Sequence, residues 1–315
     1  MMKYKLIVLI IVLPLILTAV DEDAGTTGFS FFKVNYSARA AAMASAYTGL
    51  SNDANAVYFN PAGLVQVKTN QAAVTYMSYL DGVDCGSAVY VYSLNDEVTL
   101  AAFTKGLTAK EERTLADEFG QYGGTDGTFG ISNFVFGLSA AKYLANNLDV
   151  GISLKFLQES LDDNTAAAMA FDFGIMHQTT NENLKLGIAV RNVGMQLSYY
   201  TDNEYKENLP TTASAGFSYH PIKQLFITLD IYKPMNMDYS GRLGFEYFVH
   251  PILALRAGYK SNARDWAAGG DNDAFSGIST GLGFNLQKYK LSLDYAVVSY
   301  GDLGFANLFT INYLF

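Results

Sequence analysis

Strict alternation of apolar and polar side chains constrains the fold of this chain more than any other feature. From about Thr69 onward, segments of about ten residues place a large apolar side chain at every second position. One such segment carries Leu291, Leu293, Tyr295 and Val297 in alternation with Ser292, Asp294 and Ala296. Because successive side chains of a strand point to opposite faces, each segment has one apolar face and one mixed face. The alternation predicts sheets with one apolar side, which suits a two-sheet sandwich as well as a barrel.

The connections between the segments distinguish these two architectures. We expect about fourteen strands, near residues 70–80, 85–93, 97–105, 129–143, 148–158, 166–178, 184–197, 211–219, 224–233, 240–249, 252–260, 276–286, 289–299 and 304–315. Tight turns such as Asn95-Asp96 and His220-Pro221 alternate with longer joints at 106–128, 159–165, 198–210, 234–239 and 261–275. Short periplasmic turns that alternate with longer external loops, with an even strand number, are typical of bacterial transmembrane barrels. The sequence therefore predicts an all-β chain, a transmembrane antiparallel up-and-down β-barrel in a bacterial outer membrane.

The composition agrees with a barrel whose outer face meets lipid. Half of the residues are hydrophobic and only 16% are charged, whereas a soluble domain usually carries about 25% charged residues. The net charge of −9 argues against nucleic acid as a partner. Cys85 is the only cysteine, which excludes an intramolecular disulfide and a cysteine metal cluster.

The first residues are predicted to form an export signal. Lys3 and Lys5 precede an apolar run from Leu6 to Leu17, which is shorter than the roughly 20 residues of a membrane helix. We expect a signal peptide over residues 1–24, cleaved between about 19 and 24. An uncleaved anchor is the alternative.

The charged residues of the strands share one face. An Arg or Lys on the lipid face at the bilayer midplane costs about 2–4 kcal/mol, so we expect this face to line the lumen, where the charges meet water or one another. The lumen-facing charges predicted in this way are Lys155, Asp172, Lys185, Arg191, Asp230, Arg242, Glu246, Arg256 and Asp294.

The last strand carries aromatic and aliphatic side chains at alternate positions, Phe309, Ile311, Tyr313 and Phe315. This pattern resembles the C-terminal signal that the outer-membrane barrel assembly machinery recognises. We therefore expect that machinery, outer-membrane lipid and lipopolysaccharide as partners.

Residues 25–68 lack the alternation and are expected to form a plug. Ser37 is a candidate N-cap for a short helix over 38–46, which Gly49 can end. In Asn60-Pro61-Ala62-Gly63, the proline excludes Asn60 from the helical region and Gly63 permits an unusual turn. Such a turn would direct the chain from the plug into the first strand.

The N-terminal block contains three distinctive motifs, Ala24-Gly25-Thr26-Thr27-Gly28-Phe29, Ala38-Arg39-Ala40-Ala41-Ala42-Met43 and Asn52-Asp53-Ala54-Asn55-Ala56-Val57-Tyr58-Phe59-Asn60-Pro61-Ala62-Gly63-Leu64. Together they resemble the PorV/PorQ family, within the wider group of FadL-like outer-membrane barrels. Arg191-Asn192-Val193-Gly194 and Tyr300-Gly301-Asp302-Leu303-Gly304 are similar to weaker, later signatures. Ala44 departs from the pattern, since the resemblance predicts glycine at that position.

The resemblance implies a plug over residues 25–68, with the motif residues Arg39, Asn60, Pro61, Ala62 and Gly63, followed by a fourteen-stranded barrel over 69–315. It also implies two roles. We expect a PorV/PorQ-type role in type IX protein secretion or surface attachment, with secretion components and cargo C-terminal domains as partners. The alternative is a FadL-like transporter of long-chain fatty acids or other hydrophobic solutes. The charged lumen favours the first role.

The sequence offers no candidate for a catalytic site. The three histidines, His177, His220 and His250, are predicted at separate places on the periplasmic rim. The acidic clusters at 162–164 and 271–273 lack the spacing of a known calcium loop and are expected to be solvated loop charges. We therefore expect no enzymatic activity, no catalytic residues, no metal and no cofactor.

Overall fold

The computed structural model describes residues 27–34, 36–80, 82–200, 206–262 and 269–315. The predicted signal peptide, residues 1–24, lies outside these ranges.

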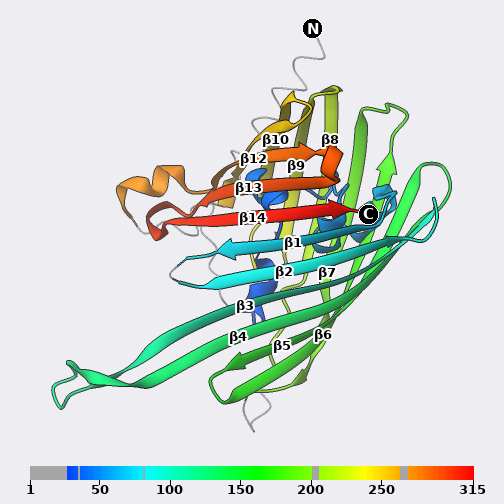
Figure 1. Cartoon of the computed structure of the whole chain (residues 1–315). Helices are drawn as coiled ribbons and strands as arrows, with labels where there is room; N and C mark the ends of the chain where they lie inside the picture. Colours follow the sequence, from blue (N-terminus) through cyan, green and yellow to red (C-terminus); the bar gives the residue numbers. More distant parts are fainter. Residues whose placement is uncertain (1–26, 35, 81, 201–205, 263–268) are drawn as a thin grey trace.

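Among the described residues, fourteen strands form one closed barrel in which each strand pairs with its sequence neighbours (Figure 1). The strands are β1 (Gln71–Ser78), β2 (Asp84–Ser93), β3 (Val98–Ala116), β4 (Tyr122–Tyr143), β5 (Leu148–Leu161), β6 (Asn164–Gln178), β7 (Leu184–Ser198), β8 (Thr212–Ile222), β9 (Leu225–Pro234), β10 (Ser240–His250), β11 (Leu253–Lys260), β12 (Ile278–Leu286), β13 (Leu291–Ser299) and β14 (Phe305–Leu314). The predicted up-and-down barrel is confirmed.

The barrel closes between its first and last strands. β1 and β14 pair antiparallel from Gln71↔Leu314 to Ser78↔Asn307. Closure leaves no sheet edge with unpaired backbone groups, which a membrane interior requires because it holds no water to satisfy them. The sandwich alternative is thereby excluded.

The outer face of the wall is apolar and exposed. In β5, Ile152, Leu154 and Phe156 are 44%, 43% and 44% exposed, whereas Ser153 and Lys155 between them are buried. An exposed apolar band around a closed barrel is the surface that lipid tails cover. Within the described ranges, no helix has the length and apolar character needed to cross a membrane.

Two predicted loops are wrong. The joint 106–128 is mostly strand, because β3 and β4 continue as a long hairpin with only residues 117–121 between them. Figure 1 shows this hairpin projecting well beyond the rest of the wall. The joint 159–165 shrinks to Asp162-Asp163 between β5 and β6. In both places water meets both faces of the sheet, so backbone pairing continues without the alternation that marks a half-buried strand.

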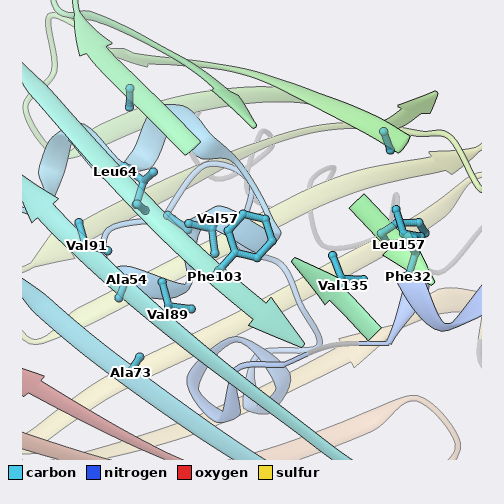
Figure 2. Packing of buried hydrophobic residues seen from close by; sticks show 14 of the residues in the cluster. Phe32, Ala54, Val57, Leu64, Ala73, Val89, Val91, Phe103, Val135 and Leu157 are labelled. Carbon is cyan, nitrogen blue, oxygen red and sulfur yellow. The ribbon is translucent and has the colours of Figure 1, made fainter. Parts of the chain in front are cut away.

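The segment 27–68 lies inside the barrel (Figure 1), and we call it the plug segment. It contains η1 (Ser30–Lys33), α2 (Ala38–Ala42), η2 (Ala54–Tyr58) and η3 (Pro61–Gln66). Figure 2 shows Val57 and Leu64 of this segment among wall side chains such as Val89 and Phe103, which belong to one buried apolar cluster.

The predicted cap of the helix is present, but the predicted helix end is wrong. The Ser37 hydroxyl accepts a hydrogen bond from the Ala40 N–H. The helix ends at Ala42 rather than Ala46, because the Ser45 N–H donates to the Ala40 carbonyl and the Ala44 N–H to the Ala41 carbonyl. These two bonds form a Schellman motif that places Ala44 in the left-handed region, at φ 52°. Glycine is usual there, which gives a physical reason for the glycine that the family resemblance predicts at this position.

Candidate functional site

The turn at Asn60 is built by the asparagine side chain, which is fully buried. Its Oδ1 accepts from the Ala62 N–H at 3.2 Å and caps η3, where Pro61 takes the first position. Its Nδ2 donates to the Thr48 carbonyl at 3.0 Å and to the Ile175 carbonyl of β6 at 3.1 Å. One side chain therefore shapes the turn and attaches the plug segment to the barrel wall.

Gly63 is required for space. A Cβ at this position would lie 1.9 Å from the Ser51 carbonyl oxygen. Gly63 is not among the described residues with a positive φ, so the predicted reason, an unusual backbone conformation, is wrong. The glycine lets two backbone segments of the plug touch.

A row of wall glycines, which the sequence analysis did not single out, accommodates the plug segment. A Cβ on Gly151 would lie 2.4 Å from the Ala62 nitrogen, and a Cβ on Gly174 would lie 2.1 Å from Asn60 Oδ1. A Cβ on Gly187 would lie 2.1 Å from the Thr48 carbonyl oxygen. Glycine inside a strand costs packing and entropy and often marks a close approach of another backbone. The signal available in the sequence was that these three glycines occupy inward-facing positions of their strands.

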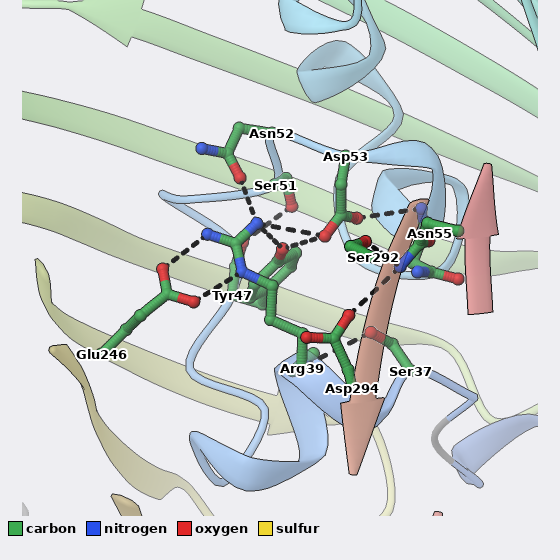
Figure 3. A network of polar contacts seen from close by, with 12 residues as sticks. Ser37, Arg39, Tyr47, Ser51, Asn52, Asp53, Asn55, Glu246, Ser292 and Asp294 are labelled. Atoms are coloured by element: carbon green, nitrogen blue, oxygen red, sulfur yellow. Dashed lines mark hydrogen bonds and ion pairs between the residues drawn. The ribbon is translucent and has the colours of Figure 1, made fainter. Parts of the chain in front are cut away.

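The α2 half of the plug segment also lies close to a wall glycine, Gly258, and is held in addition by charge. Arg39 of α2 makes a bidentate pair with Glu246 of β10, at 2.9 Å from Nε to Oε1 and 2.6 Å from Nη2 to Oε2. Its Nη1 lies 3.1 Å from Asp53 Oδ2 and donates to Asn52 at 2.7 Å. Figure 3 shows the guanidinium between Glu246 and the Asn52-Asp53 pair.

The tyrosine next to this guanidinium completes the plug side of the network. Burial raises the pKa of Tyr47 well above its usual value, so the phenol stays protonated. It donates to Asp53 at 2.6 Å and accepts from Arg39 at 2.9 Å. Asp53 also accepts from the Asn55 N–H and so caps η2. Arg39 therefore has one acidic partner on the wall, Glu246, and one on the plug segment, Asp53.

The network continues along the wall. Arg256 donates from Nε to Glu246 and from Nη1 to Asp294, both at 2.7 Å. Asn312 donates to the second oxygen of Asp294 at 3.1 Å. Glu246 is completely buried and Asp294 and Arg256 nearly so. A buried charge is costly unless it is paired, and each of these charges has an opposite partner.

The remaining charges predicted for the lumen also lie on the inward side. Lys155 pairs with Asp172 at 2.6 Å, and Lys185 donates to Gln66 of the plug segment. Asp230 accepts from the Tyr47 and Thr48 N–H groups through one oxygen, at 2.9 and 2.8 Å. Arg191 and Arg242 both lie close to the Tyr232 ring.

A chamber of about 470 Å³ lies between the plug segment and the wall. It opens toward the end of the barrel that carries the joints 79–83, 235–239 and 300–304, since Tyr79, Met237 and Tyr300 line it. Its floor is the plug segment, with Phe32 and Tyr58 among the lining residues. Ligand pockets of proteins are commonly about 300–1,000 Å³, so the chamber is large enough for a small organic molecule.

The four C-terminal residues of the predicted assembly signal lie on the outer face. Phe309, Ile311, Tyr313 and Phe315 are about 40–55% exposed. The Phe315 N–H donates to the Asn70 carbonyl at 3.0 Å, which ties the end of the chain to the start of β1. Recognition by the assembly machinery stays a prediction.

The histidines do not meet. His177, His220 and His250 lie on the separate strands β6, β8 and β10, and His220 stacks on Phe226 with 5.5 Å between ring centroids. Within the described part of the chain, no group of three or more His, Cys, Asp or Glu residues is placed to hold a metal ion.

Comparison with solved structures identifies the fold. The toluene transporter TbuX of Ralstonia pickettii superposes with a TM-score of 0.62 at 13% sequence identity, over 89% of this chain and 98% of that chain. The CymD monoaromatic hydrocarbon channel gives 0.62 at 11% identity, over 90% and 98%. A Pseudomonas aeruginosa FadL homologue gives 0.57 at 13%, over 89% and 98%.

The fold is that of the FadL-like outer-membrane barrels. No protein-family model matches the sequence, and no curated protein matches it either. At 11–13% identity the likeness is one of fold. The chain is a multi-pass outer-membrane β-barrel, and among the structures compared TbuX is a transporter and CymD a channel.

Proposed function

We propose that this protein carries hydrophobic solutes across the outer membrane, as a FadL-like transporter. The observation that carries the proposal is the chamber of about 470 Å³ enclosed between the plug segment and the wall. A barrel that only displays a docking surface has no need for an enclosed volume, whereas a transporter needs a place for its solute. The fold neighbours support this role, since they carry toluene or other monoaromatic hydrocarbons.

Transport requires part of the plug segment to move, because the segment forms the floor of the chamber. The turn at Asn60 packs directly on the wall, because Gly151 and Gly174 have no side chains that would collide with it. The α2 half is joined to the wall through the Arg39 network. An ionic contact can exchange partners or take up water. The α2 half carries this contact and lines the chamber through Ala41 and Ala44, so it is the proposed moving part.

A reversible cross-link tests this proposal. The Ser279 hydroxyl of β12 lies 3.1 Å from the Ala42 carbonyl oxygen and 2.9 Å from the Ala44 nitrogen at the end of α2, so Ala42→Cys with Ser279→Cys places two cysteines on contacting residues of α2 and the wall. Cys85→Ser removes the native thiol from this double variant. Uptake of a labelled hydrophobic solute by cells should fall when the disulfide forms and return on reduction. Each single-cysteine variant is the matched control. Uptake that ignores the cross-link would refute a moving plug.

A second function, the PorV/PorQ-type role in secretion, is favoured by one feature. The β3–β4 hairpin projects from the barrel (Figure 1), and Phe119 and Tyr122 near its tip are 77% and 70% exposed. Exposed aromatic side chains are common anchors for protein partners. Under this role, replacing residues 109–130 by a short turn should abolish surface display of secreted cargo and leave solute uptake intact. Loss of uptake with normal display would support the transporter instead.

A further inference from the structure

The charge of the chamber is opposite to that of the chain. The chain has a net charge of −9. The chamber, in contrast, is lined by six basic residues, Lys33, Lys105, Lys155, Arg191, Arg242 and Lys260, and by only two acidic ones, Asp172 and Asp238. Six against two leaves four more basic than acidic side chains around the chamber. Such a site attracts anions and repels cations.

Most of these cations are not neutralised by the protein. Lys155 is paired with Asp172. Lys33, Lys105, Arg191 and Arg242 have no carboxylate of a described residue within salt-bridge distance. Lys105 donates to the Phe32 carbonyl at 3.1 Å, and Lys33 contacts the Met237 sulfur at 3.8 Å. Neutral partners satisfy hydrogen bonds but leave the positive charge uncompensated.

The two arginines form the most distinctive part of the chamber. The Arg242 guanidinium carbon lies 3.7 Å from the Tyr232 ring centroid and that of Arg191 lies 5.5 Å from it. The Nε atoms of both arginines are buried and have no hydrogen-bond partner among the described residues. Asp230 lies opposite Arg242 in the register of the β9–β10 ladder. One of its carboxylate oxygens already accepts hydrogen bonds from the backbone N–H groups of Tyr47 and Thr48. Two like charges held beside one ring are stabilised by an anion that contacts both.

The rest of the lining offers aromatic surface. Tyr58 and Phe103 meet edge to face, with 5.4 Å between ring centroids, and both line the chamber. Phe32 of the plug segment also lines the chamber, and the Lys105 and Lys155 ammonium groups lie 5.3 and 4.9 Å from its ring centroid. Rings present flat faces and edges to a guest, and aromatic pairs gain about 0.5–1.5 kcal/mol beyond the area they bury. The chamber therefore combines a cationic pair with an aromatic cage.

We infer that the chamber binds an aromatic carboxylate, whose carboxylate is held by Arg191 and Arg242 and whose ring lies among Phe32, Tyr58 and Phe103. The inference rests on the proposed transport function and names its solute class. Guanidinium groups hold carboxylates by paired, charge-assisted hydrogen bonds. A neutral hydrocarbon leaves the excess charge uncompensated. A long flexible chain loses more conformational freedom on binding and offers no ring face to the cage.

The test compares three probes of the full chain in lipid nanodiscs by equilibrium dialysis, with protein-free nanodiscs as the partition reference. The probes are para-tert-butylbenzoate, its neutral isostere para-tert-butylbenzamide, and dodecanoate. We expect the benzoate to bind about tenfold or more tightly than the other two, because a hydrogen-bonded charge is worth more than a neutral contact. Equal or tighter binding of the amide or of dodecanoate would overturn the inference.

Variants locate the carboxylate. Arg242→Gln and Arg191→Gln should each weaken benzoate binding about tenfold and leave amide binding unchanged, and Arg242→Lys should recover part of the loss. Arg113→Gln, on the projecting hairpin, is the matched control. Heat-modifiable migration on gels checks that each variant is folded. If the glutamine variants fold and bind benzoate normally, the assignment is wrong.

Failure of this inference and failure of the transport proposal give different results. Uptake of all three probes with no preference for the carboxylate would overturn the inference and keep the transporter. Selective binding of the benzoate to purified protein without uptake by cells would keep the binding site and refute transport.

Discussion

The two halves of the plug segment share one kind of contact with the wall and differ in another. Both lie close to wall glycines: a Cβ on Gly174 would fall 2.1 Å from Asn60 Oδ1, and one on Gly258 would fall 2.3 Å from the Ala44 nitrogen. The α2 half adds an ion pair, the bidentate contact of Arg39 with the fully buried Glu246. We call this contact the ionic seat, and the contact of Asn60 with the wall glycines the steric seat. The turn at Asn60 therefore depends mainly on close packing, whereas the α2 half depends on close packing and on charge.

The largest effect is expected at the ionic seat. Arg39→Met leaves Glu246 and Asp53 without their shared cation, and breaking a buried pair costs about 3–5 kcal/mol. Urea titration of the folded protein in nanodiscs measures the loss, and faster amide exchange in 38–46 shows where it occurs. The control is Arg113→Met, whose pair with Asp162 is half exposed and should cost about 1 kcal/mol or less. Similar losses in both variants would mean that the network does not hold α2.

Charge balance sharpens this first prediction. The double variant Arg39→Met with Glu246→Gln removes both partners of the bidentate pair. It should recover part of the loss, because Glu246 in the single variant keeps Arg256 but leaves its second buried oxygen without a cation. No recovery would point to lost packing of the arginine stem as the main cause.

The steric seat should give the next largest effect. In Gly174→Ala the new methyl group meets Asn60, and overpacking of this kind costs about 1–3 kcal/mol. The matched control is Gly86→Ala in β2, where the nearest atom to an added Cβ is the Thr75 carbonyl oxygen at 3.7 Å; it should change the free energy of unfolding by about 0.5 kcal/mol or less. Equal tolerance of both alanines would break the comparison between the two halves.

Asn60 separates capping from wall attachment within the steric seat. Asn60→Ala removes the cap of η3 and both donor bonds, with an expected cost of about 1–2 kcal/mol. Asn60→Ser keeps an oxygen that can accept from Ala62 but is too short to replace both donors, so it should lose less. Identical unfolding midpoints for the two variants would show that the cap itself contributes little.

The smallest expected effect is an increase in the free energy of unfolding. Ala44 adopts φ 52° at the end of α2, where an L-residue with a Cβ pays roughly 1–2 kcal/mol relative to glycine. Ala44→Gly should raise the free energy of unfolding by about 1 kcal/mol, measured by the same titration. Ala38→Gly, inside α2, is the control and should lower it by about 0.5–1 kcal/mol. A loss in both variants would mean that the left-handed turn is not strained.

The proposed role differs from the one that the sequence favours. The N-terminal motifs and the charged lumen favour a secretion partner, whereas the fold neighbours and the chamber support a transporter. In the sequence, the lumen charge argues against an apolar conduit. The structure divides that charge between two places. Glu246, Arg256 and Asp230 belong to the contacts that hold the plug segment, whereas Lys155, Arg191 and Arg242 line the chamber.

The sequence by itself determined the strand number, the barrel topology and the inward face of each strand. Those properties follow from a period of two that each segment repeats locally, and from the order of short and long joints. Tertiary structure alone decided the length of the β3–β4 hairpin, the early end of α2 and the glycine row beneath Asn60. The hairpin has no buried face to impose alternation, and α2 ends where Ser279 of a distant strand contacts the Ala42 carbonyl and the Ala44 N–H. Each of these depends on contacts between residues far apart in the chain, which a local pattern does not record.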